Sequence, residues 1–275
     1  MSTITNSSAP ERTAERQTDK GHKRSGVRRA VLPVAVAVGL VAFWQLVCVG
    51  FGIPTYIIPK PSEVWTSLTT NWSMLLQNLW PTALESLLGF LLGNLVAILL
   101  AVLFVHWKPA EQALMPVAVF IRTIPIVAVA PVLVIMLGNG YAPKIAIAAL
   151  ISFFPTLVNM VRGLEAVDNQ SLELLRVLSA SRSEVFWKVR VFASLPYLFS
   201  SLKISATSCV IGAIVAEWIG SQVGLGYLII QATYNFNTPL LYATMVAASV
   251  MAVAFFGVIG IIEKLVVTWD AEIAP

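Results

Sequence analysis

Among the ionisable side chains that lie inside long apolar runs of this sequence, three are candidates for a functional role. They are Glu85, Arg122 and Glu217. A charge at the centre of a membrane costs about 2.5–3.5 kcal/mol on insertion scales, so such residues are expected to face protein, water or a solute. Arg122 could attract an anionic or carbonyl-bearing molecule, and Glu217 could line an outer gate. The candidate chemistry is therefore the binding and passage of a polar solute.

Each of these residues also has a structural interpretation. Arg122 lies ten residues into its run, at a depth of roughly 15 Å. Backbone carbonyls freed near Pro125 and Pro131 could satisfy it there, or it could extend toward the cytoplasm. Glu217, near the outer end of its run like Glu85, could equally be a capped carboxylate beside the lipid headgroups. The candidates for a translocation pathway are Arg122, Pro125, Glu85 and Glu217.

A small-residue pattern in the second apolar run indicates close helix packing. Gly89 and Gly93 are four residues apart and lie on one face of a helix, which lets another helix approach. Asn94 follows directly and can form a hydrogen bond across that contact. We expect these three residues to pack helices together.

Other residue types that do chemistry are scarce. The chain has two histidines, His22 and His106, and two cysteines, Cys48 and Cys209, that stand singly in apolar runs. A metal site or a disulfide framework is not indicated by this spacing. A membrane enzyme would need clustered His, Asp, Cys or Ser, so this class is disfavoured.

Composition predicts a polytopic, all-α membrane protein. The 275 residues are 57% hydrophobic and 12% charged, with a mean hydropathy of +0.81, whereas soluble domains are roughly one-quarter charged. Nothing in the sequence suggests binding to nucleic acid. Six runs are long enough to cross a lipid bilayer: 31–50, 82–105, 112–137, 144–161, 197–219 and 239–262.

The distribution of basic residues predicts the orientation. With the N-terminus placed inside, fifteen Lys and Arg residues fall on the cytoplasmic side, against Lys60 and Lys144 outside. Both termini are then cytoplasmic. The expected organisation is a disordered basic tail at 1–30, a membrane domain at 31–268 and a short cytoplasmic tail at 269–275.

This orientation places the charged segment 163–196 in the cytoplasm. Asp168 can cap a first helix, Ser179-Ala180 forms a break, and Ser181 with Glu184 has the capping-box spacing that opens a second short helix. Two amphipathic helices carry more apolar surface than one membrane face needs. The segment is either an interfacial hairpin packed on its own spans or a docking element for a soluble partner.

The residues of this segment resemble a known family. ELLRVLSASRSEVFWKVRVFASLP (173–196) is similar to the cytoplasmic loop of binding-protein-dependent ABC importer permeases, whose pattern is Glu-Ala-Ala, three residues, Gly, nine residues, Ile-x-Leu-Pro. The resemblance covers nearly all of 31–268 and points to the nitrate/sulfonate/taurine-type branch. It includes IPKPSEVW (58–65), LLGFLLGNLVAILLAV (87–102), IRTIPIVAVAPVLVIMLG (121–138), FFPTLVNMVRGLEAVD (153–168) and GAIVAEWIGSQVGLGYLI (212–229).

This chain departs from the family pattern at three places. Leu174-Leu175 replace two alanines, Ser179 replaces the glycine and Phe192 replaces the first proline. Serine adopts a left-handed backbone less readily than glycine. Either the break at Ser179 stays in right-handed space, or the partner's groove differs.

The resemblance implies a type I ABC importer permease fold in the bacterial inner membrane, with residues 171–191 as a coupling helix that docks on an ATPase. The implied docking residues are Glu173, Leu178, Ser179, Ala180, Ser181, Arg182, Glu184 and Phe186. The sequence contains no GxxxxGK[ST], so the chain is not expected to be an enzyme or to hold a cofactor. ATP and magnesium are expected in two ATP-binding subunits that join two permease copies and an extracytoplasmic binding protein.

The substrate is the least determined feature. The stretch NFNTPLLYA (235–243) resembles carriers of heterocycles such as a thiamine-precursor pyrimidine or riboflavin. Nitrate, sulfonate and taurine are the alternatives within the same machinery. A secondary transporter driven by an ion gradient is the alternative of another class, and it would need ionisable relay groups near the membrane midplane.

Overall fold

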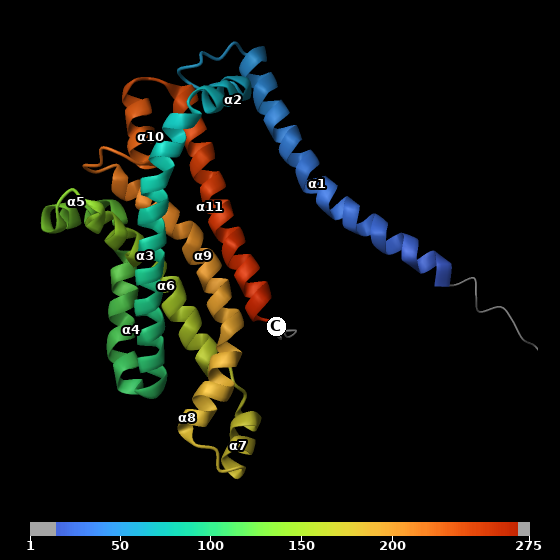
Figure 1. Ribbon diagram of the computed structural model, residues 1–275, viewed down its shortest axis with the longest axis vertical. Coiled ribbons are helices and arrows are strands. Elements are labelled where there is room, and N and C mark those ends of the chain that lie inside the picture. Colours follow the sequence, from blue (N-terminus) through green and yellow to red (C-terminus); the bar gives the residue numbers. More distant parts are fainter. Residues whose placement is uncertain (1–14, 269–275) are drawn as a thin grey trace, which may run out of the picture. The chain divides into compact units, whose positions relative to one another are not determined.

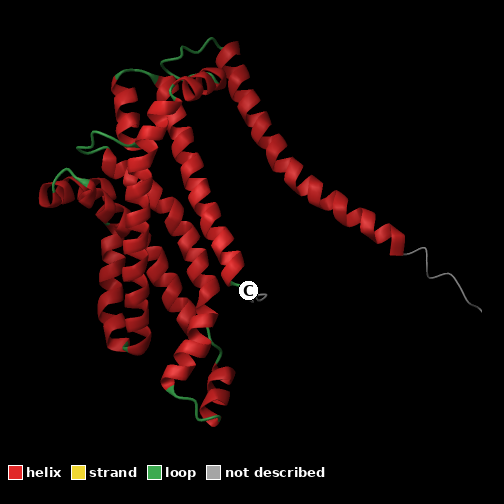
Figure 2. Ribbon diagram, viewed as in Figure 1, coloured by secondary structure: helices red, strands yellow, loops and turns green. Residues whose placement is uncertain are grey.

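The computed structural model describes residues 15–268, which form helices joined by loops and turns (Figures 1 and 2). Side chains are described from Leu32 onward, except Pro33. The first half of the predicted N-terminal tail, 1–14, and the C-terminal tail, 269–275, lie outside the described residues. The chain divides into two compact units, residues 1–63 and 64–275.

The first unit contains α1 (Glu15–Gly50) and the start of α2 (Pro61–Thr70). Because α1 begins at Glu15, it includes the second half of the segment that the sequence predicts to be disordered. Its apolar part, Val34–Gly50, is about 26 Å long at 1.5 Å per residue, slightly less than a hydrocarbon core of about 30 Å. A first membrane span therefore stays a prediction.

The second unit is a helical bundle. Its elements are α3 (Trp72–His106), α4 (Lys108–Thr123), α5 (Ile126–Leu137), α6 (Tyr141–Glu165), α7 (Asn169–Val177), α8 (Arg182–Val185), the π-helix η1 (Phe186–Arg190), α9 (Val191–Glu217), α10 (Leu225–Tyr234) and α11 (Thr238–Val266). Four helices in the described part are long and apolar enough to cross a membrane: α3, α6, the continuous helix Arg182–Glu217, and α11. Figure 1 shows α7 and α8 at one end of this bundle and α10 near the other. The predicted all-α membrane architecture is thus confirmed.

The core of the bundle forms where α6 packs against α3 and α9. Its main apolar cluster joins Ala97, Ala101 and Phe104 of α3 to Leu157 and Leu164 of α6, all fully buried. Alanines on α3 opposite larger side chains on α6 let the two backbones lie close. This helix pair is the frame that positions the polar residues described below.

The span predicted over 112–137 is bent in the structure and stays a prediction. The axes of α4 and α5 differ by 98°, so together they form a broken span or a re-entrant loop. The cause is Pro125, which has no N–H to continue the helix and disfavours a helical conformation in the residue before it. Ile124 is accordingly extended, with φ −70° and ψ 124°. Arg122 therefore lies in the last turn of α4, directly before the break, and not in mid-helix.

Candidate functional site

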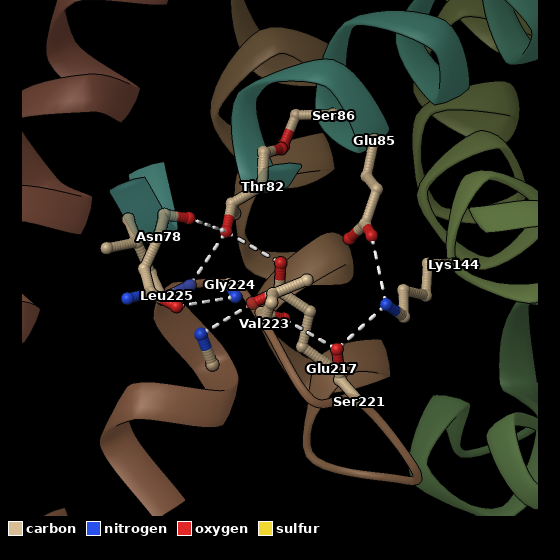
Figure 3. Close-up of polar contacts among 11 residues, drawn as sticks. Asn78, Thr82, Glu85, Ser86, Lys144, Glu217, Ser221, Val223, Gly224 and Leu225 are labelled. Carbon is tan, nitrogen blue, oxygen red and sulfur yellow. Dashed lines mark hydrogen bonds and ion pairs between the residues drawn. The ribbon is translucent and has the colours of Figure 1, made fainter. Parts of the chain in front are cut away.

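Glu85 and Glu217 come together in one buried group of polar residues, which we call the carboxylate cluster (Figure 3). Their exposed fractions are 0% and 1%. Lys144 Nζ lies 3.1 Å from Glu85 Oε1 and donates a hydrogen bond to Ser221 Oγ at 2.8 Å. The sequence count treats Lys144 as a lysine on the outer surface, but only 7% of its side chain is exposed. Its ammonium therefore neutralises a buried charge.

Glu217 connects the end of α9 to α3 and to the start of α10. Thr82 Oγ1 donates to Glu217 Oε1 at 2.6 Å, and the Gly226 N–H donates to Glu217 Oε2 at 2.5 Å. Thr82 also accepts from the Leu225 N–H at 2.8 Å, and Asn78 Oδ1 accepts from the Gly224 N–H at 2.9 Å. These bonds satisfy the N–H groups of Gly224, Leu225 and Gly226 at the start of α10. The carboxylate cluster thereby fastens the 218–224 loop to α3.

Two glycines make room for the Glu217 side chain. Gly224 has φ +114°, and a Cβ added to it would overlap the Glu217 carboxylate. A Cβ on Gly226 would overlap the Ile214 carbonyl and lie 2.8 Å from Glu217 Cβ. The sequence analysis does not find this relationship, although Gly224-Leu-Gly226 follows Glu217 closely in the sequence. A pathway role for Glu85 and Glu217 stays a prediction.

Arg122 and Pro125 lie at the break between α4 and α5, apart from the carboxylate cluster. The Arg122 guanidinium carbon is 4.6 Å from the centre of the Phe154 ring on α6, a cation–π contact. A cavity of about 480 Å³ lies beside it, lined mainly by apolar side chains of α4, α5, α6 and α9. Ser208 on α9 adds a hydroxyl to this wall.

Gly89, Gly93 and Asn94 lie where α3 meets α6. A Cβ on Gly89 would overlap Ala148, and one on Gly93 would overlap α6 backbone at Ala149. Asn94 Oδ1 accepts a hydrogen bond from Thr156 Oγ1 on α6 at 2.5 Å. Thr156 also lies 3.0 Å from Ser205 Oγ on α9. The structure therefore places the three residues at a close helix contact, bridged by hydroxyl groups.

The segment 163–196 contains the two helices and the caps that the sequence predicts. Asp168 Oδ1 accepts from the Ser171 N–H at 2.5 Å, and Asp168 Oδ2 accepts from Ser171 Oγ at 3.0 Å. These two hydrogen bonds lower the pKa of Asp168 below its ordinary value. Ser181 and Glu184 form the capping box, with the Ser181 N–H donating to Glu184 Oε2 at 3.0 Å. The prediction that the second helix is short is wrong, because α8 continues through η1 into α9 without a break.

The break at Ser179 does not stay in right-handed space. Ser179 has φ +56°. Its N–H donates to the Arg176 carbonyl at 3.0 Å, and the Ala180 N–H donates to the Leu175 carbonyl at 3.0 Å. These two bonds form a Schellman motif, which usually has glycine at this position. Serine therefore takes a left-handed turn at this position despite its steric cost.

The side chains implied in docking are mostly exposed. Leu178 is 68% exposed, beside Val177 at 81% and Leu174 at 60%. Ala180 is partly buried, whereas the other docking candidates in this group are exposed: Glu173, Ser179, Ser181, Arg182 and Glu184. A hollow of about 430 Å³ beside them is lined by Arg176, Arg182, Arg190 and His106.

Phe186 differs from the other docking candidates because it is only 6% exposed. It packs into the core beside α3 and α6, and its ring lies edge-on to His106 with 4.6 Å between centroids. A side chain in this position anchors η1 to the end of α3. Phe186 was expected to take part in docking from the family resemblance, whereas no role was expected for His106.

Comparisons with known proteins identify the family of this chain. Residues 93–269 match the binding-protein-dependent transport system inner membrane component family. The chain belongs to this family. It is an ABC importer permease subunit, a multi-pass protein of the bacterial inner membrane and not a catalytic domain. The resemblance found in the sequence is therefore confirmed.

Relatives cover most of the permease. A probable ABC transporter permease of Haemophilus influenzae is 33% identical over 86% of this chain and 98% of the relative. The riboflavin transport system permease RibX of Chloroflexus aurantiacus is 32% identical over 88% of this chain and 90% of its own length. The formylaminopyrimidine transport permease ThiX of Halalkalibacterium halodurans is 29% identical over 88% of this chain and 96% of its own length.

A solved structure supports the fold. A chain of the MetNI methionine ABC transporter, in an inward-facing conformation, matches the permease with a TM-score of 0.63. The match covers 71% of this chain and 97% of the other at 16% identity. Identity this low shows a shared fold alone, which is the type I importer permease fold.

Proposed function

We propose that the permease moves a small organic solute inward by alternating access, driven by a separate ATPase that docks on residues 171–191. In the proposed complex, two copies of the permease join two ATP-binding subunits, which hold ATP and magnesium, and an extracytoplasmic binding protein. Six spans with both termini in the cytoplasm put the docking segment on the side where ATP is available.

One observation carries the coupling proposal: the hairpin exposes an apolar tip. Val177 and Leu178 stand in solvent beside the break, although the caps at Asp168 and Ser181 hold both helices in place. Exposed apolar groups of this kind mark interaction sites. The arginine-lined hollow next to the tip is suited to an acidic surface on the partner.

The proposed substrate is a heterocycle such as riboflavin or a thiamine-precursor pyrimidine. The support is the similarity to RibX and ThiX, which are named for such solutes and are 32% and 29% identical to this permease. A permease named for aliphatic sulfonates in Bacillus subtilis is also 29% identical, and one named for nitrate in Synechocystis is 24% identical. Sulfonate, taurine and nitrate therefore remain the alternative substrates. Thermal shift of the cognate binding protein with riboflavin, a formylaminopyrimidine, taurine and nitrate separates these choices.

The coupling proposal is tested with Leu178→Glu in the reconstituted complex. A charge on the apolar tip should weaken docking, so uptake falls at least tenfold and hydrolysis no longer responds to the binding protein. Gln170→Glu is the matched control, because Gln170 is also exposed on α7 but lies in its first turn, away from the tip. Normal ATP-driven uptake by Leu178→Glu would place docking elsewhere. Uptake that follows an ion gradient without ATP would instead support a secondary transporter.

A further inference from the structure

Arg122 is a cation at the end of α4, and the described part of the chain gives it no hydrogen-bonding partner. Among the residues that the structure describes, it forms no hydrogen bond or ion pair, and its contact is the Phe154 ring. It is fourteen residues beyond Lys108, the first residue of α4, or about 21 Å along the helix. A guanidinium carries five N–H donors, and leaving donors unsatisfied in hydrocarbon costs several kcal/mol. The face of α4 that carries Arg122 must therefore meet water, a solute or protein.

Two lysines on the long helices of the bundle are paired within the chain. Lys144 lies beside Glu85, and Lys203 Nζ lies 2.8 Å from Glu263 Oε2. The cavity next to Arg122 has no carboxylate in its wall. These two lysines therefore have a counter-charge within the chain, whereas the exposed Arg122 is left to bind an outside acceptor.

The cavity has the dimensions and the polar groups of a small-molecule site. Its volume of about 480 Å³ falls within the range of about 300–1,000 Å³ that is common for ligand pockets. Besides Arg122, the wall contains the Ser208 hydroxyl and residue Ile151. Pro155 has no N–H with which to form the usual helical bond to the Ile151 carbonyl. The cavity wall thus combines the N–H donors of Arg122 and a few polar groups with apolar and aromatic side chains.

We propose that this cavity, which we call the Arg122 chamber, binds the transported solute during its passage. The solute class is a small organic molecule with an apolar or aromatic body and oxygen acceptors, either an oxyanion or ring carbonyls. Phe154 covers one face of the guanidinium and leaves its N–H edge for paired contacts with such oxygens. The inference rests on the proposed transport function and adds the place and chemistry of binding.

The chamber is tested with a thiol at Ser208 in the complete transporter, with Cys48 and Cys209 replaced by alanine. The probes are an anionic and a cationic methanethiosulfonate of similar size, which label a thiol that water can reach. We expect the anionic probe to label Ser208→Cys about tenfold faster than the cationic one, after correction for their rates with a free thiol. Arg122→Gln should abolish this preference, whereas Arg122→Lys should retain it.

Control positions keep the result interpretable. Val253→Cys lies on the exposed apolar side of α11, outside the chamber, and should react slowly with both probes. If replacing the buried Cys209 unfolds the protein, a parallel set retains it and uses unsubstituted permease as the background. Absence of labelling at Ser208→Cys, or a preference that survives Arg122→Gln, would overturn the chamber. Neither outcome depends on the ATPase, so ATP-driven uptake tests the proposed function separately.

Discussion

The Glu217 carboxylate fills the space that a side chain on Gly224 would occupy. Gly224 also has φ +114°, which residues other than glycine rarely adopt. The position of the Glu217 carboxylate at the end of α9 thus requires a glycine seven residues later. Together with Gly226, they fix how α9 is connected to α10.

Gly224→Ala should therefore displace the 218–224 loop and lower the apparent Tm of the purified permease by several degrees. Gly257→Ala on α11 is the matched control, because a Cβ there meets nothing within 4 Å. Adding Glu217→Ala to Gly224→Ala should recover part of the loss by removing the overlap. Equal Tm values for Gly224→Ala and Gly257→Ala would show that the contact between Gly224 and the Glu217 carboxylate is not tight.

Lys144→Met should destabilise the permease because it leaves Glu85 as an unpaired buried charge. Breaking a buried pair from one side costs about 3–5 kcal/mol. Lys203→Met breaks the more exposed pair with Glu263, so it should cost no more than about 1 kcal/mol. Thermal unfolding of both variants in detergent measures the difference. Lys144→Met with Glu85→Leu should be more stable than Lys144→Met alone, and the opposite order would contradict the pairing.

Ser179→Gly should stabilise the hairpin formed by α7 and α8, because glycine adopts φ +56° without the steric cost of about 1–2 kcal/mol that a side chain has there. Slower amide exchange over 169–185 would report the gain. Ser183→Gly is the same substitution inside α8, where glycine should instead cost about 0.5–1 kcal/mol. If both substitutions slowed amide exchange, or both speeded it, the left-handed turn at Ser179 would be contradicted.

Asp168→Ala should speed amide exchange in the first turn of α7 by removing its cap. The hydrogen bonds from Ser171 lower the pKa of Asp168 from its ordinary value of 3.8. A lowered folded pKa means that the cap's contribution is complete above the unfolded value and is lost only as the pH falls through the folded one. The difference between the parent and Asp168→Ala should therefore be the same at pH 5 and pH 8. A difference that shrinks at pH 5 would indicate a carboxylate with a raised pKa.

The hairpin could be predicted from the sequence because its signals are local. A cap or a capping box acts between residues three apart, so Asp168, Ser181 and Glu184 specify it alone. The break after Arg122 could also have been predicted from the sequence, because Pro125 disfavours a helical conformation at Ile124. Span prediction missed it because hydropathy measures how apolar a run is and not whether its helix continues.

The carboxylate cluster could not be predicted because its contacts join distant parts of the chain. Lys144 and Glu85 are 59 residues apart in the sequence, and counting charges on each side of the membrane assigns Lys144 to water. In the sequence, Gly224 and Gly226 indicate only a loop. Their role in making room for the Glu217 side chain appears only in the structure. The left-handed backbone at Ser179 was likewise not predicted, because serine rarely adopts that conformation.

The helix from Arg182 to Glu217 gives the bundle a mechanical property. Its 36 residues are continuous through the π-helix η1 and past Pro196, and they would span about 54 Å as a straight rod. A tilt of about 5° around the middle of such a rod moves each end by roughly 2 Å, in opposite directions. That displacement is enough to break the hydrogen bonds that Glu217 forms with Thr82 and Gly226. We therefore expect a tilt imposed on this helix near Arg182 to disturb the contacts of Glu217 at its other end.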